Sequence, residues 1–171
     1  MNNKIVPSVI RFFVFAALQA IVFNNLQLNT YVNVFIYTAF ILLLPFEIPG
    51  WLLLLAGFSM GLLMDVFSST GGLHAAASTF MAFCRPGVLR FIAPRDGYDS
   101  ASTPSISSMG LNWFVTYALL LVFLHNFVCF FLEVFRFSEF FFTITKIILT
   151  TFVTVLLIIA AQLVRGKSIK S

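Results

Sequence analysis

Charged residues are scarce in this sequence. Only 9% of its 171 residues are Asp, Glu, Lys or Arg, whereas an ordinary soluble domain carries roughly a quarter. Hydrophobic residues make up 60% of the chain, so it cannot cover itself with polar surface. This balance excludes an ordinary soluble enzyme and indicates a protein that is solvated largely by lipid.

The apolar runs also lack the strict polar–apolar alternation of transmembrane β-strands. Because hydrocarbon offers the backbone no hydrogen-bonding partners, each membrane-spanning run is expected to be a helix. No internal repeat divides the chain. The predicted fold class is therefore an all-α membrane bundle, with one domain over residues 1–171.

Cysteine is scarce as well, which bears on redox and metal chemistry. Cys84 and Cys129 are single residues in different apolar runs, without CxxC spacing, and are predicted to be packing residues. The other possible metal ligands fall on at least three predicted spans without ligand spacing: Asp65, His74, His125 and Glu133. Neither a metal nor another cofactor is expected.

The apolar runs predict about six transmembrane helices, at Val9–Phe23, Val32–Pro45, Trp51–Phe67, Leu73–Ile92, Leu111–Leu132 and Phe140–Val164. No small-residue cleavage site follows the first run, which is predicted to be a retained helix. The second and third are short for a hydrocarbon core of about 30 Å, and a tight Pro45–Gly50 link joins them, so they form an untilted or a partly re-entrant pair. Residues from about 95 to 109 are Ser-rich and predict a flexible loop.

Orientation follows from the basic residues, because Lys and Arg near span ends stay on the cytoplasmic side. With six spans, three clusters fall on one side: Lys4 and Arg11; Arg85, Arg90 and Arg95; Arg165, Lys167 and Lys170. On the opposite side Arg136 is the only clear basic residue. Both termini and the 95–109 loop are thus predicted to be cytoplasmic. Anchoring to anionic lipid headgroups accounts for the net charge of +4, so no nucleic-acid partner is expected.

Small residues mark one face of the third predicted span. Gly57, Gly61 and Asp65 recur every four residues and therefore share that face, which predicts close packing against a helix of this chain or of a partner protein. Ala16 and Ala20 repeat the pattern in the first span.

Asp65 is the most informative residue, because a carboxylate in hydrocarbon costs a few kcal/mol and needs a partner. The turn after it is short, so a hydrogen-bonded pair of Asp65 with His74 at the outer leaflet is predicted, with helix-end N–H groups as the alternative. The hydroxyls of Ser68, Ser69 and Thr70 suit backbone capping better than a hydrolytic triad, so no enzymatic activity is predicted.

Further polar residues lie toward the outer ends of the last two spans. His125, Asn126, Cys129 and Glu133 predict either a polar seam between helices or the wall of a small pocket. Lys146 either extends to the membrane interface or pairs with Glu133 or Glu139.

Residues Leu44–Arg95 resemble the rod shape-determining protein MreD family. The resemblance rests on GLLMDVF, which starts at Gly61, and on GLHA, which starts at Gly72 and leads into the next helix, at similar spacing. Spans one, five and six match only in character. The resemblance implies a non-enzymatic scaffold in the bacterial inner membrane that binds the bitopic protein MreC, and through it MreB filaments and peptidoglycan synthases.

The same resemblance implies a second possibility. The MreD family is similar in fold to the substrate-binding subunits of energy-coupling-factor vitamin transporters, which implies a six-helix bundle with a central pocket. Those subunits contact a transmembrane partner through small residues on the first helix, comparable to Ala16 and Ala20. The alternative function is therefore a vitamin-binding transporter subunit, although the short apolar outer loops favour the scaffold.

Overall fold

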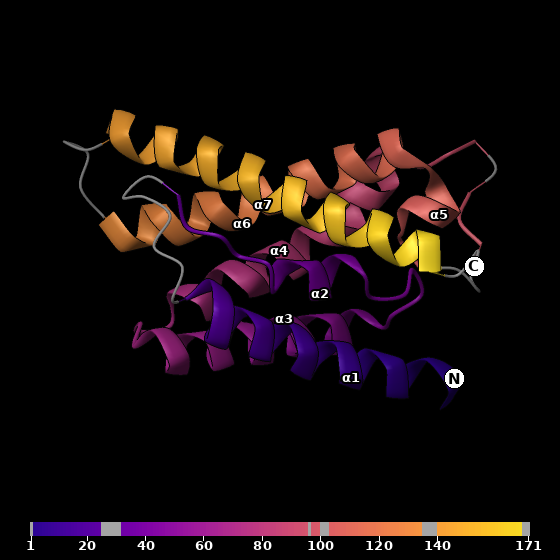
Figure 1. Ribbon diagram of the computed structural model, residues 1–171, viewed down its shortest axis with the longest axis horizontal. Coiled ribbons are helices and arrows are strands. Elements are labelled where there is room, and N and C mark those ends of the chain that lie inside the picture. Colours follow the sequence, from indigo (N-terminus) through magenta and orange to yellow (C-terminus); the bar gives the residue numbers. More distant parts are fainter. Residues whose placement is uncertain (1, 25–31, 96, 100–102, 135–139, 169–171) are drawn as a thin grey trace.

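The computed structural model describes residues 2–24, 32–95, 97–99, 103–134 and 140–168. All the regular elements in these ranges are helical (Figure 1), which confirms the all-α class. They are α1 (Asn2–Leu18), the π-helix η1 (Gln19–Phe23), α2 (Thr38–Leu42), α3 (Gly50–Ser68), α4 (Leu73–Phe91), α5 (Ile106–Met109), α6 (Leu111–Val134) and α7 (Phe140–Ser168).

The long helices pack in chain order. α3 lies against α4, α4 against α6, and α6 against α7, while α1 lies beside α2 and α3. Figure 1 shows α6 and α7 on one side of the bundle, α1 and α3 on the other, and α4 between them. The start of α1, the end of α7 and α5 lie at the same end of the bundle. We call this the α5 end, and the end where α3 turns into α4 the turn end.

Three helices of the described part are long and apolar enough to cross a membrane: α3, α6 and residues Phe140–Val164 of α7. Pro7–Phe23 is a shorter apolar helix. Large apolar side chains also point outward, including Phe13 on α1, Leu55 on α3 and Phe152 on α7. Outward apolar surface on apolar helices is what lipid solvation requires, which indicates a membrane protein.

The second predicted span is wrong in form. Residues Val32–Pro45 are not one helix, since only Thr38–Leu42 are α-helical and residues 33–35 have no regular structure. This crossing segment (residues 32–45) nevertheless runs from the turn end to the α5 end (Figure 1). Residues 34–44 are all buried. Non-helical backbone at membrane depth is tolerated only where protein covers it and satisfies its polar groups.

Side chains from α7 satisfy the first part of the crossing segment. The N–H of Asn33 donates to Thr150 Oγ1 at 3.2 Å, and the N–H of Phe35 donates to Thr154 Oγ1 at 3.3 Å. Two residues of extended chain advance about 6.6 Å, and four residues of α-helix advance about 6.0 Å. The two repeats nearly match, so threonines one helical turn apart can serve alternate N–H groups.

Gln19 serves the same segment from the other side. Its amide Nε2 donates to Val34 O at 2.8 Å, and its Oε1 accepts from the N–H of Tyr37 at 3.4 Å. The backbone changes from α to π geometry at this residue, a change often found at functional sites. Gln19 therefore ties the first helix to the crossing segment.

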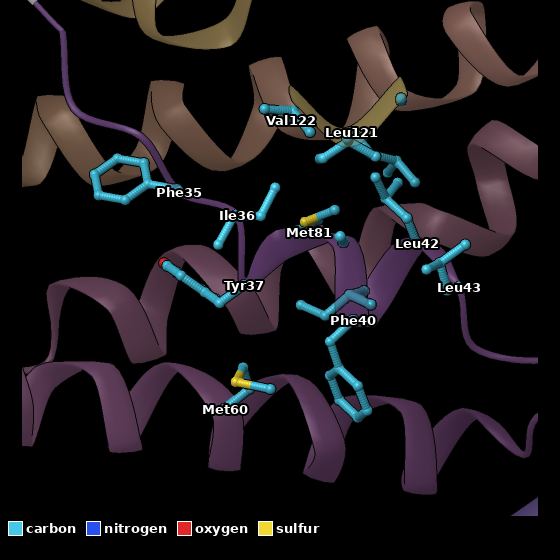
Figure 2. Close-up of a cluster of buried hydrophobic side chains, with 14 of the residues drawn as sticks. Phe35, Ile36, Tyr37, Phe40, Leu42, Leu43, Met60, Met81, Leu121 and Val122 are labelled. Atoms are coloured by element: carbon cyan, nitrogen blue, oxygen red, sulfur yellow. The ribbon is translucent and has the colours of Figure 1, made fainter. Parts of the chain in front are cut away.

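The core lies around α2. Figure 2 shows the Phe40 ring turned toward α3, which contributes Met60, while Met81 comes from α4 and Leu121 and Val122 from α6. These side chains are at most 4% exposed, so α2 is enclosed by protein rather than by lipid.

The segment that follows α4 was expected to be a flexible loop over about 95–109. Residues 96 and 100–102 lie outside the described part, but Tyr98 stacks on Phe46 with ring centroids 4.4 Å apart and donates to Leu89 O at 2.7 Å. Burial raises the pKa of Tyr98 above that of a free phenol, which is itself protonated at neutral pH, so this hydroxyl is a donor there. Ser105 then caps α5 by accepting from the N–H of Ser108. The described parts of the loop are thus held against the bundle.

Candidate functional site

Asp65 caps the start of α4. Its Oδ1 accepts from the N–H of His74 at 3.0 Å and from the hydroxyl of Thr70, and its Oδ2 accepts from the N–H of Ala75 at 2.9 Å. The first N–H groups of a helix lack intrahelical partners, and the positive end of the helix dipole favours a carboxylate there. Left-handed backbone at Ser69 and Gly72 folds the turn so that Asp65 reaches those groups.

The predicted Asp65–His74 pair forms differently from the side-chain pair that the sequence suggested. The carboxylate bonds the main chain of His74, which is the helix-end alternative, while the imidazole Nδ1 lies 3.0 Å from the hydroxyl of Tyr37. The physical reason is that two unpaired N–H groups at a helix start offer a carboxylate a better-matched site than one ring nitrogen.

Substitutions of Asp65 are expected to rank Asp above Asn, and Asn above Leu, in the yield of folded protein. Asn keeps one accepting oxygen but turns an NH₂ group toward the N–H of Ala75, which leaves one buried N–H unpaired at about 1–3 kcal/mol. Leu leaves both N–H groups unpaired. Fluorescence-detected size-exclusion chromatography of tagged variants measures the order. An Asn variant as poorly folded as Leu would show that the negative charge itself is required.

The glycine face of α3 packs inside this chain. A Cβ on Gly61 would lie 2.3 Å from His74 O, and a Cβ on Gly57 would lie 2.9 Å from the Cβ of Ala82. Both contacts are with α4. Of the two predicted roles, packing within the chain or against a partner protein, the structure therefore supports packing within the chain. The glycines let α3 approach α4 closely enough for Asp65 to reach the α4 N–H groups.

The small residues of α1 are also turned inward. Ala16 is 3% exposed and belongs to the buried core, while Ala20, in η1, is half-buried. η1 lies against α3, as does α1. Ala16 is therefore not open to a partner protein.

A buried polar network lies toward the turn end of the bundle, and we call it the Tyr37 cluster. The Tyr37 hydroxyl lies 2.7 Å from His125 Nε2 as well as 3.0 Å from His74 Nδ1. His125 Nδ1 lies 3.1 Å from Asn126 Oδ1, and Asn126 Nδ2 donates to Thr151 Oγ1 at 2.9 Å. Cys129 Sγ adjoins His74 Nδ1 at 3.8 Å. The cluster joins the crossing segment to α4, α6 and α7.

Between the two predicted roles of the α6 residues, this arrangement corresponds to a polar seam. His125, Asn126 and Cys129 contact residues of the crossing segment, α4 and α7. Among the buried side-chain nitrogen and oxygen atoms of the described residues, only Ser78 Oγ, which lies beside Tyr37, lacks a partner in hydrogen-bonding geometry. A seam whose polar groups bind each other leaves few of them for a ligand.

A second buried polar group lies near the α5 end, where α2 stops. Arg85 Nε donates to Tyr117 Oη at 2.7 Å, and the guanidinium also donates to Leu44 O and Pro45 O. Tyr117 in turn donates to Leu42 O at 3.1 Å. Together with Arg11 Nη1, which donates to Leu43 O, these side chains satisfy four consecutive carbonyls, that of the last residue of α2 and those of the three residues that follow it.

Arg85 does not belong with the cytoplasmic basic residues among which its sequence position places it, so that prediction is wrong. The side chain is 1% exposed and bonds protein carbonyls rather than headgroups. The carbonyl end of a helix attracts a cation, and an arginine supplies several donors at once, so this cation acts as a cap. Arg90 and Arg95 are exposed, as expected.

Lys146 pairs with Glu133 rather than extending to the membrane interface. Its Nζ lies 3.1 Å from Glu133 Oε2 and 4.4 Å from the centre of the Phe130 ring. Glu139 and Arg136 lie outside the described residues.

The described residues contain no group of three or more His, Cys, Asp or Glu side chains placed to hold a metal ion. Cys84 and Cys129 are free thiols. Among the turn hydroxyls, Thr70 bonds Asp65 and Ser68 Oγ accepts from Asn24 Nδ2.

Sequence reasoning missed five residues that organise the interior: Gln19, Tyr37, Tyr117, Thr150 and Thr154. All are polar groups within apolar runs. The spacing of Thr150 and Thr154, one helical turn apart, was the available signal for a polar stripe on α7.

Comparison with known proteins finds no matching protein family, no matching curated protein and no matching solved structure.

Proposed function

We propose that this chain is a non-enzymatic membrane scaffold of the MreD type, which binds an MreC-like bitopic protein and supports cell shape and peptidoglycan synthesis. The observation that supports the proposal most is the turn between α3 and α4. The residues on which the resemblance rests act there as one unit: Gly61 lets the helices touch, Asp65 caps α4, and Gly72 adopts the left-handed turn.

The use of buried polar groups also favours a scaffold over a transporter subunit. A vitamin-binding subunit needs polar side chains that are free to bind a ligand. In the Tyr37 cluster these groups bind one another. Of the two small residues that would contact the transporter partner, Ala16 is buried and Ala20 is half-buried. A scaffold needs only outward helix faces, such as the one that carries Leu55, Leu62 and Val66 on α3.

The proposed location is the bacterial inner membrane, with the N- and C-termini in the cytoplasm. The proposed six passes are α1 with η1, the crossing segment, α3, α4, α6 and α7. The same-end placement of α5, the start of α1 and the end of α7 supports this orientation (Figure 1). Arg90, in the last turn of α4, and Arg95, which follows that helix, are exposed and support it as well. Lys170 lies outside the described residues.

Depletion of the chain is expected to make rod-shaped cells round, and purification of a tagged copy in mild detergent is expected to recover an MreC-like protein. Cells that keep their shape but lose uptake of a vitamin would instead support the transporter alternative. Normal shape and normal uptake would contradict both functions.

A further inference from the structure

Hydrogen-bond directions in the Tyr37 cluster can be assigned from chemistry. Asn126 Nδ2 faces Thr151 Oγ1, and its Oδ1 faces His125. The oxygen of a carboxamide only accepts, so in this amide orientation His125 Nδ1 carries a hydrogen. In a neutral imidazole the other nitrogen is then bare, so His125 Nε2 accepts from the Tyr37 hydroxyl. The Tyr37 oxygen has lone pairs left and accepts from His74 Nδ1–H. When both rings are neutral, the hydrogen bonds therefore run in series from His74 through Tyr37 to His125.

This series of hydrogen bonds can accept a proton without the loss of any bond in it. A proton that binds His74 Nε2 makes that ring an imidazolium, and every bond described above remains. His74 can then pass its Nδ1 proton to the Tyr37 oxygen while Tyr37 passes its hydroxyl proton to His125 Nε2. His74 is left neutral with its hydrogen on Nε2, Tyr37 is again a phenol, and His125 carries the charge. Only N–H and O–H bonds form and break, and no electron is transferred.

A second proton meets a different situation. Both ring nitrogens that face Tyr37 would then carry hydrogens, so the Tyr37 hydroxyl would lose both imidazole acceptors and keep beside it only Ser78 Oγ, which does not lie in hydrogen-bonding geometry. The two positive rings would also share one oxygen as their bonding partner, and like charges at such separations oppose each other. Hydrogen bonding and charge therefore limit the cluster in the same direction.

We propose that the Tyr37 cluster is a single-proton site, in which His74 and His125 share one added proton through the hydroxyl of Tyr37. The charge finds favourable surroundings on two sides: Asp65 on α3 near His74, and Glu133 on α6, which is paired with Lys146 of α7. Cys129, also on α6, is the remaining titratable neighbour. Burial opposes the charge, so occupancy depends on the pH of the medium.

The chain has only two histidines, which makes a direct test possible. A tag without histidine and ¹⁵N-labelled histidine give a spectrum of the four ring nitrogens of this site alone. The protein is placed in lipid nanodiscs and followed by ¹⁵N NMR between pH 8 and pH 4. At pH 8 both rings should be neutral, with the His125 hydrogen on Nδ1. On acidification the two rings together should gain one proton, shared between them.

Tyr37→Phe removes the relay while keeping the ring. In this variant the signals of the two histidines should no longer change together, and the added proton should stay on one ring. Tyr98→Phe, which changes another hydrogen-bonded phenol far from the cluster, is the matched control and should leave the histidine titration unchanged.

The wild-type titration alone can overturn the proposal. Uptake of two protons in one unresolved step would show that the rings are independent, and no protonation of either ring down to pH 4 would show that the cluster is not a proton site. Neither outcome bears on the scaffold function, because that function is tested separately by cell shape and by recovery of the partner protein.

Discussion

Replacing Gly61 by alanine is expected to abolish most of the folded protein. The new Cβ would lie 2.3 Å from His74 O and 2.6 Å from the Cα of Ala75, both backbone atoms that no rotamer change can move. Overpacking of a core typically costs about 1–3 kcal/mol and more where backbone must shift, which exceeds the gain of up to about 1 kcal/mol from replacing a helical glycine by alanine. Separation of α3 from α4 would also draw Asp65 away from its N–H partners.

Two other glycines provide a graded control for this prediction. At Gly57 the nearest contacts of an added Cβ are 2.9 Å, so alanine should be destabilising but less so. At Gly87, on α4 itself, an added Cβ meets nothing within 4 Å, and alanine should be neutral or slightly stabilising. Folded yield and thermal unfolding in detergent measure all three. Equal stability of the Gly61 and Gly87 variants would contradict the α3–α4 contact.

Arg85→Met is expected to destabilise the bundle by about 3 kcal/mol or more. Methionine fills a similar volume but leaves Leu44 O and Pro45 O without donors, and each unpaired buried carbonyl costs about 1–3 kcal/mol. Tyr117 keeps its bond to Leu42 O but loses the Arg85 Nε donor. Arg85→Lys should rescue only part of the loss, because an ammonium cannot reach all three acceptors in the guanidinium geometry.

Arg90→Met is the matched control, since Arg90 lies on the same helix and is exposed. Its effect on unfolding should stay within about 0.5 kcal/mol. If the Arg85 and Arg90 variants unfold at the same temperature, the buried position of Arg85 is wrong and the residue belongs with the cytoplasmic basic cluster.

Most helix positions could be predicted from sequence, because each long helix has a clear apolar run and a turn-forming start. The predicted Trp51–Phe67 span is α3 (Gly50–Ser68), and the predicted Leu73–Ile92 span is α4 (Leu73–Phe91), with Pro49 and Gly72 just before them. The starts at Leu111 and Phe140 also agree with α6 and α7. Apolar length and helix-start chemistry are local properties, which a sequence displays directly.

The non-helical part of the crossing segment could not be predicted, because an apolar run of this length is typical of a helix rather than of a strand. What decides its form is the set of donors and acceptors around it, and these come from Gln19, Arg85 and two threonines of α7. The Tyr37 cluster could not be predicted for a related reason. A tyrosine in an apolar run is counted as hydrophobic, although its hydroxyl determines which residues it bonds.

The extended start of the crossing segment is held by side chains of α7 and not by its own side chains. At positions 33 and 35 the bond is made by the backbone N–H, so it depends on neither side chain and only proline would remove it. Positions 150 and 154 must keep a hydroxyl. During evolution the exposed position 33 can therefore diverge while the bond persists, whereas Phe35 is held by its place in the buried core, and the hydroxyls that fix the shape of this segment lie more than a hundred residues away, on another helix.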